Sequence, residues 1–189
     1  MTPKIWQRKL ELKYSSDVID IIQFGSSIFD EENANDVDIA VIFNKIFIKE
    51  QLEQSQQIKR QLEKYTAKPI HISSFDLESF FDDSNFSREG ILIYGKSILT
   101  KKDFVERFGL ISKLQISYSL KELDKKDKIR LNYSFNGRAG KYGLFRIHGG
   151  KIISPGTIEI NPEKELIFVN AIKELTNEYK IKKVLICAN

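Results

Sequence analysis

The sequence has a single cysteine and no long apolar run, and both absences narrow the class of protein. Cys187 alone cannot build a disulfide framework, and its place in a short apolar stretch predicts a packed side chain rather than a nucleophile. Apolar runs such as 91–94 and 184–187 fall far short of the ~20 residues that a membrane helix needs. The residues after Met1 include no apolar signal segment, so we expect a cytoplasmic protein without membrane contact.

The composition is that of a globular protein with room for two small domains. Of its 189 residues, 41% are hydrophobic and 30% are charged, which argues against disorder. Residues 1–100 carry 12 Lys and Arg against 16 Asp and Glu, a net charge of −4, whereas residues 101–189 carry 18 against 10, a net charge of +8. We therefore predict an N-terminal domain over 1–100 and a basic α+β domain over 101–189. The surplus cations either bind a phosphate-rich ligand or only solubilise the surface.

Hydrophobic periodicity predicts alternating strands and helices in the N-terminal domain. Pro69 ends the helical pattern before it, and Ser74 or Asp76 is suited to cap the short helix that follows. The expected order is strand 18–24, strand 37–43, helix 48–65, strand 69–72, helix 75–81 and, over 86–99, a helical turn with a short strand.

The C-terminal domain shows a different pattern, in which glycines punctuate short β-prone runs. Gly149-Gly150 lies between two such runs and predicts a β-hairpin there. The expected order is helix 103–123, a lysine-rich break at 124–128, mainly β structure with a hairpin of 142–147 and 151–160, helix 162–179 and strand 183–186.

Two short patterns in the first domain carry candidate chemistry. Asp36 and Asp38 stand two residues apart on an expected strand, so both carboxylates project from one face and can share a metal site. Carboxylates are the oxygen ligands that Mg²⁺ accepts, and a bound divalent cation can neutralise a triphosphate. Gly25 ends the preceding strand and allows close approach to a phosphate, which the hydroxyls of Ser26 and Ser27 can contact.

Taken together, Phe24-Gly25-Ser26, the nine-residue spacer and Asp36-Val37-Asp38-Ile39 resemble the active-site pattern of polymerase-β-type nucleotidyltransferases. Within that superfamily, residues 15–100 are similar to the small stand-alone minimal members. The resemblance implies an α/β (α+β) core with a mixed sheet and flanking helices. It also implies two divalent metal ions at Asp36 and Asp38, a nucleoside triphosphate donor, and transfer of a nucleoside monophosphate to a hydroxyl.

The sequence departs from the family pattern at two places. The family usually has a third carboxylate on its third strand, where this chain offers His71 or Ser73. His71 could act as a general base or as a ligand better matched to Mn²⁺ or Zn²⁺ than to Mg²⁺, or it could only pack on the strand. The loop after Ser26 lacks the arginine found in many small members and holds Asp30, Glu31 and Glu32, which we expect to repel a triphosphate.

A second phosphate-binding pattern is present but lies in the wrong context. Residues 90–97 satisfy the P-loop formula Gly-x4-Gly-Lys-Ser. A P-loop must follow a core strand and open a helix, and its central residues are usually small or polar. Here Ile-Leu-Ile-Tyr fills the centre and no strand is expected before it, so we interpret this match as coincidental.

The segment from Lys121 to Lys151 holds nine Lys or Arg against three acidic residues, with aromatic residues between them. Cations that neutralise phosphates and rings that stack bases are the usual combination for single-stranded or looped RNA, so RNA or DNA is a possible partner. The candidate nucleic-acid residues are Arg130, Arg138, Lys141 and Arg146. Equally open is a small β unit whose aromatic residues form its core and whose lysines face solvent.

These observations predict a metal-dependent nucleotidyltransferase. The expected catalytic residues are Asp36, Asp38 and His71, the expected cofactor is Mg²⁺ or Mn²⁺, and the expected donor is a nucleoside triphosphate, with ATP favoured. The acceptor would be a hydroxyl, with RNA as a candidate. The alternative is a catalytically degenerate member that binds nucleic acid or a partner protein, as an antitoxin does.

Overall fold

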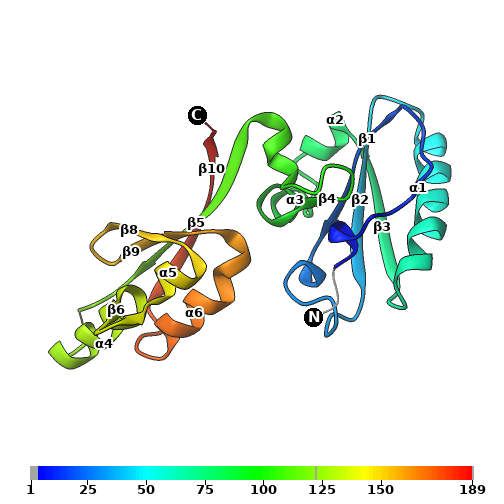
Figure 1. Ribbon diagram of the computed structural model, residues 1–189. Helices are drawn as coiled ribbons and strands as arrows, with labels where there is room; N and C mark the ends of the chain where they lie inside the picture. Colours follow the sequence, from blue (N-terminus) through cyan, green and yellow to red (C-terminus); the bar gives the residue numbers. More distant parts are fainter. Residues whose placement is uncertain (1–3, 122, 189) are drawn as a thin grey trace. The chain divides into compact units, whose positions relative to one another are not determined.

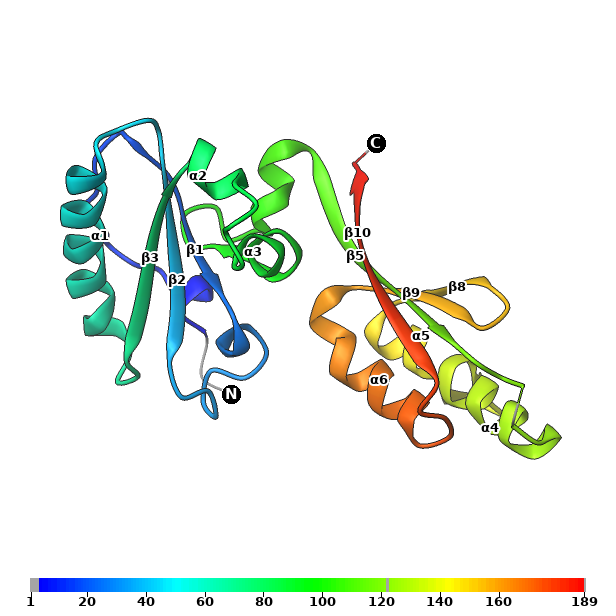
Figure 2. The same cartoon turned by 180° about the vertical axis from the view of Figure 1, so that it is seen from behind.

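The computed structural model describes residues 4–121 and 123–188, which form two compact units (Figures 1 and 2). The first unit runs to Leu110 and also includes Ala188, and the second covers Ile111–Cys187. The first unit extends past Thr100 because Phe104 is buried in its core, in edge contact with Phe80. Both units combine helices with β-sheet, so the chain is α+β.

The first unit is built on a four-stranded mixed sheet with the strand order β3-β2-β1-β4. Strands β2 and β3 run parallel, whereas β1 is antiparallel to both β2 and β4. Its elements are η1 (Ile5–Gln7), β1 (Val18–Phe24), η2 (Ser26–Ile28), β2 (Val37–Phe43), α1 (Ile48–Leu62), η3 (Glu63–Tyr65), β3 (Ile70–Asp76), α2 (Leu77–Phe81), α3 (Arg88–Tyr94), β4 (Lys96–Ser97) and η4 (Phe104–Phe108).

Helices cover both faces of this sheet, with α1 on one side and α2 and α3 on the other (Figure 2). Side chains alternate between the faces along a strand. On β2, Ile39 therefore packs in the core with α1, and Ala40 and Ile42 pack with Phe80 and Ile91 of the opposite layer. Burial on both faces explains why β2 reads as a nearly continuous apolar run.

The second unit contains a sheet with the strand order β10-β5-β9-β8 and a small two-stranded ladder, β6-β7. In its core, Phe168 lies 5.6 Å from Phe145 and 5.9 Å from Phe135 between ring centroids. Its elements are β5 (Leu110–Tyr118), α4 (Lys125–Asn136), β6 (Gly137–Arg138), β7 (Lys141–Tyr142), α5 (Leu144–His148), β8 (Lys151–Ser154), β9 (Thr157–Ile160), η5 (Pro162–Lys164), α6 (Glu165–Lys173) and β10 (Tyr179–Cys187).

The expectations for the first unit are confirmed with small changes in boundaries. Strands β1 and β2 cover the predicted residues 18–24 and 37–43. The third strand is longer than expected and ends at Asp76, so the short helix begins at Leu77. Asp76 is its cap, because a carboxylate oxygen accepts a hydrogen bond from Ser79 N at 2.8 Å.

The helix expected over 103–123 is wrong, because residues 104–108 form a short 3-10 helix and residues 110–118 form strand β5. Gly109, at φ 68°, ends the short η4 turn in a left-handed conformation. Beyond it Ser112, Leu114 and Ile116 are buried in alternation, and this period of two is that of a strand. The helical interpretation failed because the apolar positions fit both periods.

The lysine-rich break expected at 124–128 is also wrong, since helix α4 begins there. Asp124 caps the helix by accepting a hydrogen bond from Asp127 N at 2.7 Å. Leu131 and Phe135 lie one helical turn apart on its buried face. The helix ends at Gly137, whose φ of 86° a residue with a side chain rarely adopts.

The hairpin expected across Gly149-Gly150 is wrong as well, because residues 144–148 form helix α5. The hairpin lies later and pairs β8 with β9 across a turn at Pro155-Gly156. The helix expected over 162–179 is shorter, with α6 ending at Lys173, and the last strand, expected at 183–186, covers Tyr179–Cys187.

The expectation for the single cysteine is wrong. Cys187 was expected to be packed, but its side chain is exposed on β10. Within residues 4–121 and 123–188, no helix has the length and apolar character needed to cross a membrane.

Candidate metal centre

The register of the first sheet brings together the residues that the sequence marks as candidates. Asp38 on β2 lies opposite Phe24 on β1 and opposite His71 on β3. The parallel pairing of β2 with β3 places Ser73 opposite Ala40, one pleat further along. His71, and not Ser73, therefore stands beside the carboxylate pair.

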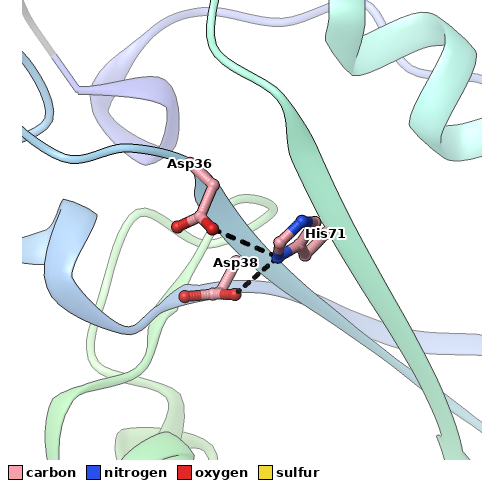
Figure 3. A group of neighbouring side chains, drawn as sticks. All are labelled: Asp36, Asp38 and His71. Atoms are coloured by element: carbon pink, nitrogen blue, oxygen red, sulfur yellow. Dashed lines mark ion pairs between the residues drawn. The ribbon is translucent and has the colours of Figure 1, made fainter.

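The three side chains converge on one point, as Figure 3 shows. His71 Nδ1 lies 3.2 Å from Asp36 Oδ2 and 3.8 Å from Asp38 Oδ1. One ligand atom from each residue fits within 4.8 Å of the other two. The carboxylates are partly buried, with about 30% of each side chain exposed, while the His71 side chain is 67% exposed. This arrangement can hold a divalent cation that remains open to a substrate.

Asp38 carries an electrostatic penalty that a cation would relieve. Its pKa is raised above the ordinary value, mainly because burial disfavours the charged form and also because the Asp36 carboxylate lies nearby. His71 acts in the opposite direction but does not cancel these effects. Two carboxylates placed together in a partly dry site are an unfavourable arrangement unless a positive charge joins them.

Gly25 forms the wall of this site next to Asp38. Its φ of 73° and ψ of −162° belong to a region that is essentially restricted to glycine. A Cβ on Gly25 would overlap Asp38 Oδ2 and would come within 3.1 Å of Asp38 Cγ. The backbone at the end of β1 can approach the carboxylate only because this position has no side chain.

The two serines that follow Gly25 have different environments. Ser26 is exposed at the start of η2, next to the glycine turn. Ser27 is fully buried, and its hydroxyl accepts a hydrogen bond from Gln23 Nε2 and donates to the Phe24 carbonyl. We expected both hydroxyls to contact a phosphate, but Ser27 is committed to the interior and only Ser26 faces outward.

The loop that holds Asp30, Glu31 and Glu32 was expected to repel a triphosphate, but Glu31 is buried and its charge is paired. Glu31 is 8% exposed, and its carboxylate accepts hydrogen bonds from Ile5 N at 2.8 Å and Gln23 Nε2 at 3.0 Å. Arg8 also pairs with it at 3.3 Å. Glu31 therefore anchors the N-terminal segment, and its charge is compensated within the unit. This contact was not predicted. The sequence indicates it only through an acidic residue between the site motifs and an arginine near the N-terminus.

The P-loop formula at 90–97 has no phosphate-binding geometry. Gly90 lies inside helix α3, and the helix precedes strand β4, the reverse of the order that a P-loop requires. Lys96 is 5% exposed and forms an ion pair with Asp103. This lysine stabilises the fold, in agreement with the interpretation that the match is coincidental.

The candidate nucleic-acid residues of the second unit fall into two groups. Arg130 on α4 lies 3.7 Å from Glu174, so its charge is paired. Arg138, Lys141 and Arg146 lie on β6, β7 and α5, and all three are exposed. They are close together in the chain because α4, the β6-β7 ladder and α5 follow one another directly.

No family model, curated protein or solved structure matches this chain. Its chemistry is therefore inferred from the positions of its own residues.

Proposed function

We propose that the first unit is a metal-dependent nucleotidyltransferase that moves a nucleoside monophosphate from a nucleoside triphosphate, with ATP favoured, to a hydroxyl acceptor. The observation that carries this proposal is the convergence of Asp36, Asp38 and His71, whose ligand atoms lie within 4.8 Å of one another. The site lies beside Gly25, where a side chain would overlap Asp38. The mixed sheet with helices on both faces and the order of the motifs support the polymerase-β-like fold suggested by the sequence resemblance.

In this proposal Asp36 and Asp38 hold the cation, either Mg²⁺ or Mn²⁺, and His71 contributes Nδ1 as a third donor. When bound, the cation would neutralise charge on the triphosphate and on the leaving pyrophosphate. Next to the Gly25 turn, the exposed Ser26 hydroxyl can donate to a phosphate oxygen. The acceptor oxygen would bond to the α-phosphorus and lose its proton to solvent, while the bond between the α-phosphorus and the bridging oxygen breaks and pyrophosphate leaves.

His71 replaces the third carboxylate that the resemblance implies, and this replacement changes the expected metal preference. Imidazole suits transition metals better than Mg²⁺. A site with two carboxylates and one histidine should therefore favour Mn²⁺ over Mg²⁺. The contact of His71 Nδ1 with both carboxylates supports the role of a ligand over that of a packed surface residue.

The test is to incubate the protein with α-labelled nucleoside triphosphates, Mn²⁺ or Mg²⁺ and total RNA, and to follow transfer of label. We expect labelling by the wild type and none by Asp36→Asn/Asp38→Asn. The matched control, Glu53→Gln/Asp83→Asn, removes the same charge from exposed positions outside the site and should label normally. Absence of labelling by the wild type under every condition would contradict the proposal.

A second candidate function is a degenerate nucleotidyltransferase that binds a ligand without catalysis. His71 favours it, because this residue stands where a third metal-binding carboxylate is expected. It predicts that no acceptor is labelled and that nucleic-acid binding by the second unit is the same in Asp36→Asn/Asp38→Asn as in the wild type.

A further inference from the structure

The second unit carries an exposed cluster of cations and tyrosines around its two-residue β-ladder. We call this cluster the basic hairpin surface and define it by five residues, Tyr133, Arg138, Lys141, Tyr142 and Arg146. All five are exposed, with 37% exposure for Tyr133 and 59% for Tyr142. The surface is distinct from the metal centre, because every residue in it belongs to the second unit.

Glycine fixes the shape of this hairpin. A Cβ on Gly137 would overlap the Lys141 carbonyl, and a Cβ on Gly143 would overlap the Phe135 carbonyl. The connecting residues Ala139 and Gly140 both have positive φ, at 48° and 83°, as a tight type I′ turn requires. The hairpin thus joins α4 to α5 through a tight turn whose backbone conformation depends on these glycines.

Two arginines on this surface lie over tyrosine rings. The Arg146 guanidinium is 3.8 Å from the centre of the Tyr142 ring, and the Arg138 guanidinium is 4.8 Å from that of Tyr133. Each pair presents a flat face of delocalised charge next to an aromatic ring. Guanidinium planes and aromatic faces are the two side-chain surfaces on which nucleobases stack.

The charges on the hairpin are not neutralised by the rest of the unit. Arg138 and Lys141 lie directly opposite each other in the ladder, and like charges in that arrangement are destabilising. Among residues 4–121 and 123–188, no carboxylate forms an ion pair with Arg138, Lys141 or Arg146, in contrast to the Arg130–Glu174 pair on α4. An anionic ligand would remove this repulsion.

The core of the unit accounts for the other aromatic residues of the segment. Phe135 is 1% exposed and lies 5.3 Å from Phe145 between ring centroids, so these two rings serve packing. Tyr133 and Tyr142 stand outside that cluster. The aromatic residues of the segment thus divide into a packed pair, held by helices α4 and α5 and not by the expected β unit, and an exposed pair.

We propose that the basic hairpin surface binds single-stranded nucleic acid, with phosphates contacting Arg138 and Lys141 and bases stacking on the arginine–tyrosine pairs. A duplex would offer phosphates but would keep its bases stacked inside, leaving the tyrosines unused. Carboxylates of an acidic protein would pair with the edges of the guanidinium groups and would leave the guanidinium and tyrosine faces without stacking partners.

The direct test is fluorescence anisotropy with a labelled oligouridine of about 16 nucleotides, the upper end of what one small domain covers. Measurements are made on the full chain in EDTA and without nucleotide. Each phosphate contact contributes roughly 0.7 to the slope of log affinity against log salt for single strands. We expect Arg138→Gln/Lys141→Gln to lower that slope by about 1.4 and the affinity at 0.1 M salt by about 25-fold.

Two further variants separate charge from stacking. Lys180→Gln/Lys182→Gln removes the same charge from β10 and should leave the affinity nearly unchanged. Arg138→Lys/Arg146→Lys keeps the charge but loses the planar group, so the salt slope should persist while the affinity falls. Thermal melting of each variant confirms folding, and the lysine variant supplies a test if the glutamine variant unfolds.

Several outcomes would overturn this inference. These are wild-type binding too weak to measure, equal losses in the hairpin and β10 variants, equally tight binding of duplex RNA, or equally strong competition by polyglutamate. Single-stranded DNA in a parallel titration shows whether the sugar matters.

That the bound strand supplies the acceptor hydroxyl rests on the proposed function. Labelling that survives loss of hairpin binding would reject this link alone, and binding without labelling would reject the transferase alone.

Discussion

Substitution of Gly25 by alanine tests whether the end of β1 belongs to the metal centre. At φ 73° and ψ −162°, the backbone of this residue lies where an alanine is strained by about 1–3 kcal/mol. The added Cβ would also overlap Asp38 Oδ2, and such overpacking typically costs a further ~1–3 kcal/mol. These two contributions sum to about 2–6 kcal/mol, and we expect Gly25→Ala to lower the free energy of unfolding by an amount near the middle of that range, about 4 kcal/mol.

The functional effect follows from how the overlap is relieved. The carboxylate of Asp38 must rotate away from Gly25, and it then no longer aligns with Asp36 and His71. Displacing a metal ligand through its support commonly lowers metal affinity by about 10–100-fold. Because the loss of stability is smaller than the ~5–15 kcal/mol of an ordinary domain, Gly25→Ala should remain folded. We expect a folded variant that binds Mn²⁺ weakly and does not transfer label.

Two other glycines supply matched controls. Gly109 has a φ of 68°, but a Cβ there would meet no atom within 4 Å, so Gly109→Ala should lose only about 1–2 kcal/mol of stability. Gly90 lies inside helix α3 with open space around it, and Gly90→Ala should gain about 0.5–1 kcal/mol. Urea denaturation gives the stabilities, and calorimetric titration gives Mn²⁺ affinity. If Gly25→Ala bound Mn²⁺ as tightly as Gly109→Ala, the proposed metal centre would be wrong.

Three more predictions concern side chains of the first unit. His71→Ala should lower Mn²⁺ affinity at least about tenfold, and His71→Asp should restore a three-carboxylate site that prefers Mg²⁺; equal titrations for all three proteins would contradict the role of His71. Glu31→Ala should lower the free energy of unfolding by about 2–3 kcal/mol, because it removes the acceptor of the buried Ile5 N–H and the ion pair with Arg8. An unchanged urea midpoint would refute this prediction. Burial, opposed by Ser97 and Arg107, raises the pKa of Asp20. The folded state thus binds this proton more tightly than the unfolded state does. As the pH rises from about 4 through the raised pKa, the wild type should therefore lose stability relative to Asp20→Asn. A stability difference that does not change with pH would contradict this prediction.

The first unit could be predicted well because its strands are buried on both faces and end at clear signals. The segment 37–43 is apolar after Asp38, and Gly25 and Pro69 mark turns that any arrangement must respect. The second unit has a similar share of apolar residues, but fewer of them are buried, and its elements are amphipathic. There the run 110–118 fits both a helix and a strand, and pairing with β9 and β10 selects the strand.

Glycine residues predicted where the chain changes direction, but not always which elements each turn joins. Gly25 was expected to let the backbone approach a phosphate, and the structure shows another close approach at this position, that of the backbone to the Asp38 carboxylate. Gly149-Gly150 was expected to turn a hairpin, but it follows helix α5, where Gly149 at φ 77° ends the helix. Positive φ is common to hairpin turns and helix ends. A glycine pair therefore marks a change of direction without saying which elements it joins.

The candidate metal centre depends on one feature that the sequence does not specify, the register of β3 against β2. The carboxylates Asp36 and Asp38 share a face by the period of a strand, which needs no tertiary structure. Whether His71 or Ser73 joins them depends on the register of β3 against β2. A shift of two residues would exchange the two on the same face, because side chains alternate with period two. The observed register pairs Asp38 with His71. In this register Ile70 is buried on the α1 face together with Ile39 and Leu62, while Phe75 packs on the other face. The pairing of β3 with β2 makes His71, and not Ser73, the third candidate donor, and the proposed site is therefore predicted to prefer Mn²⁺.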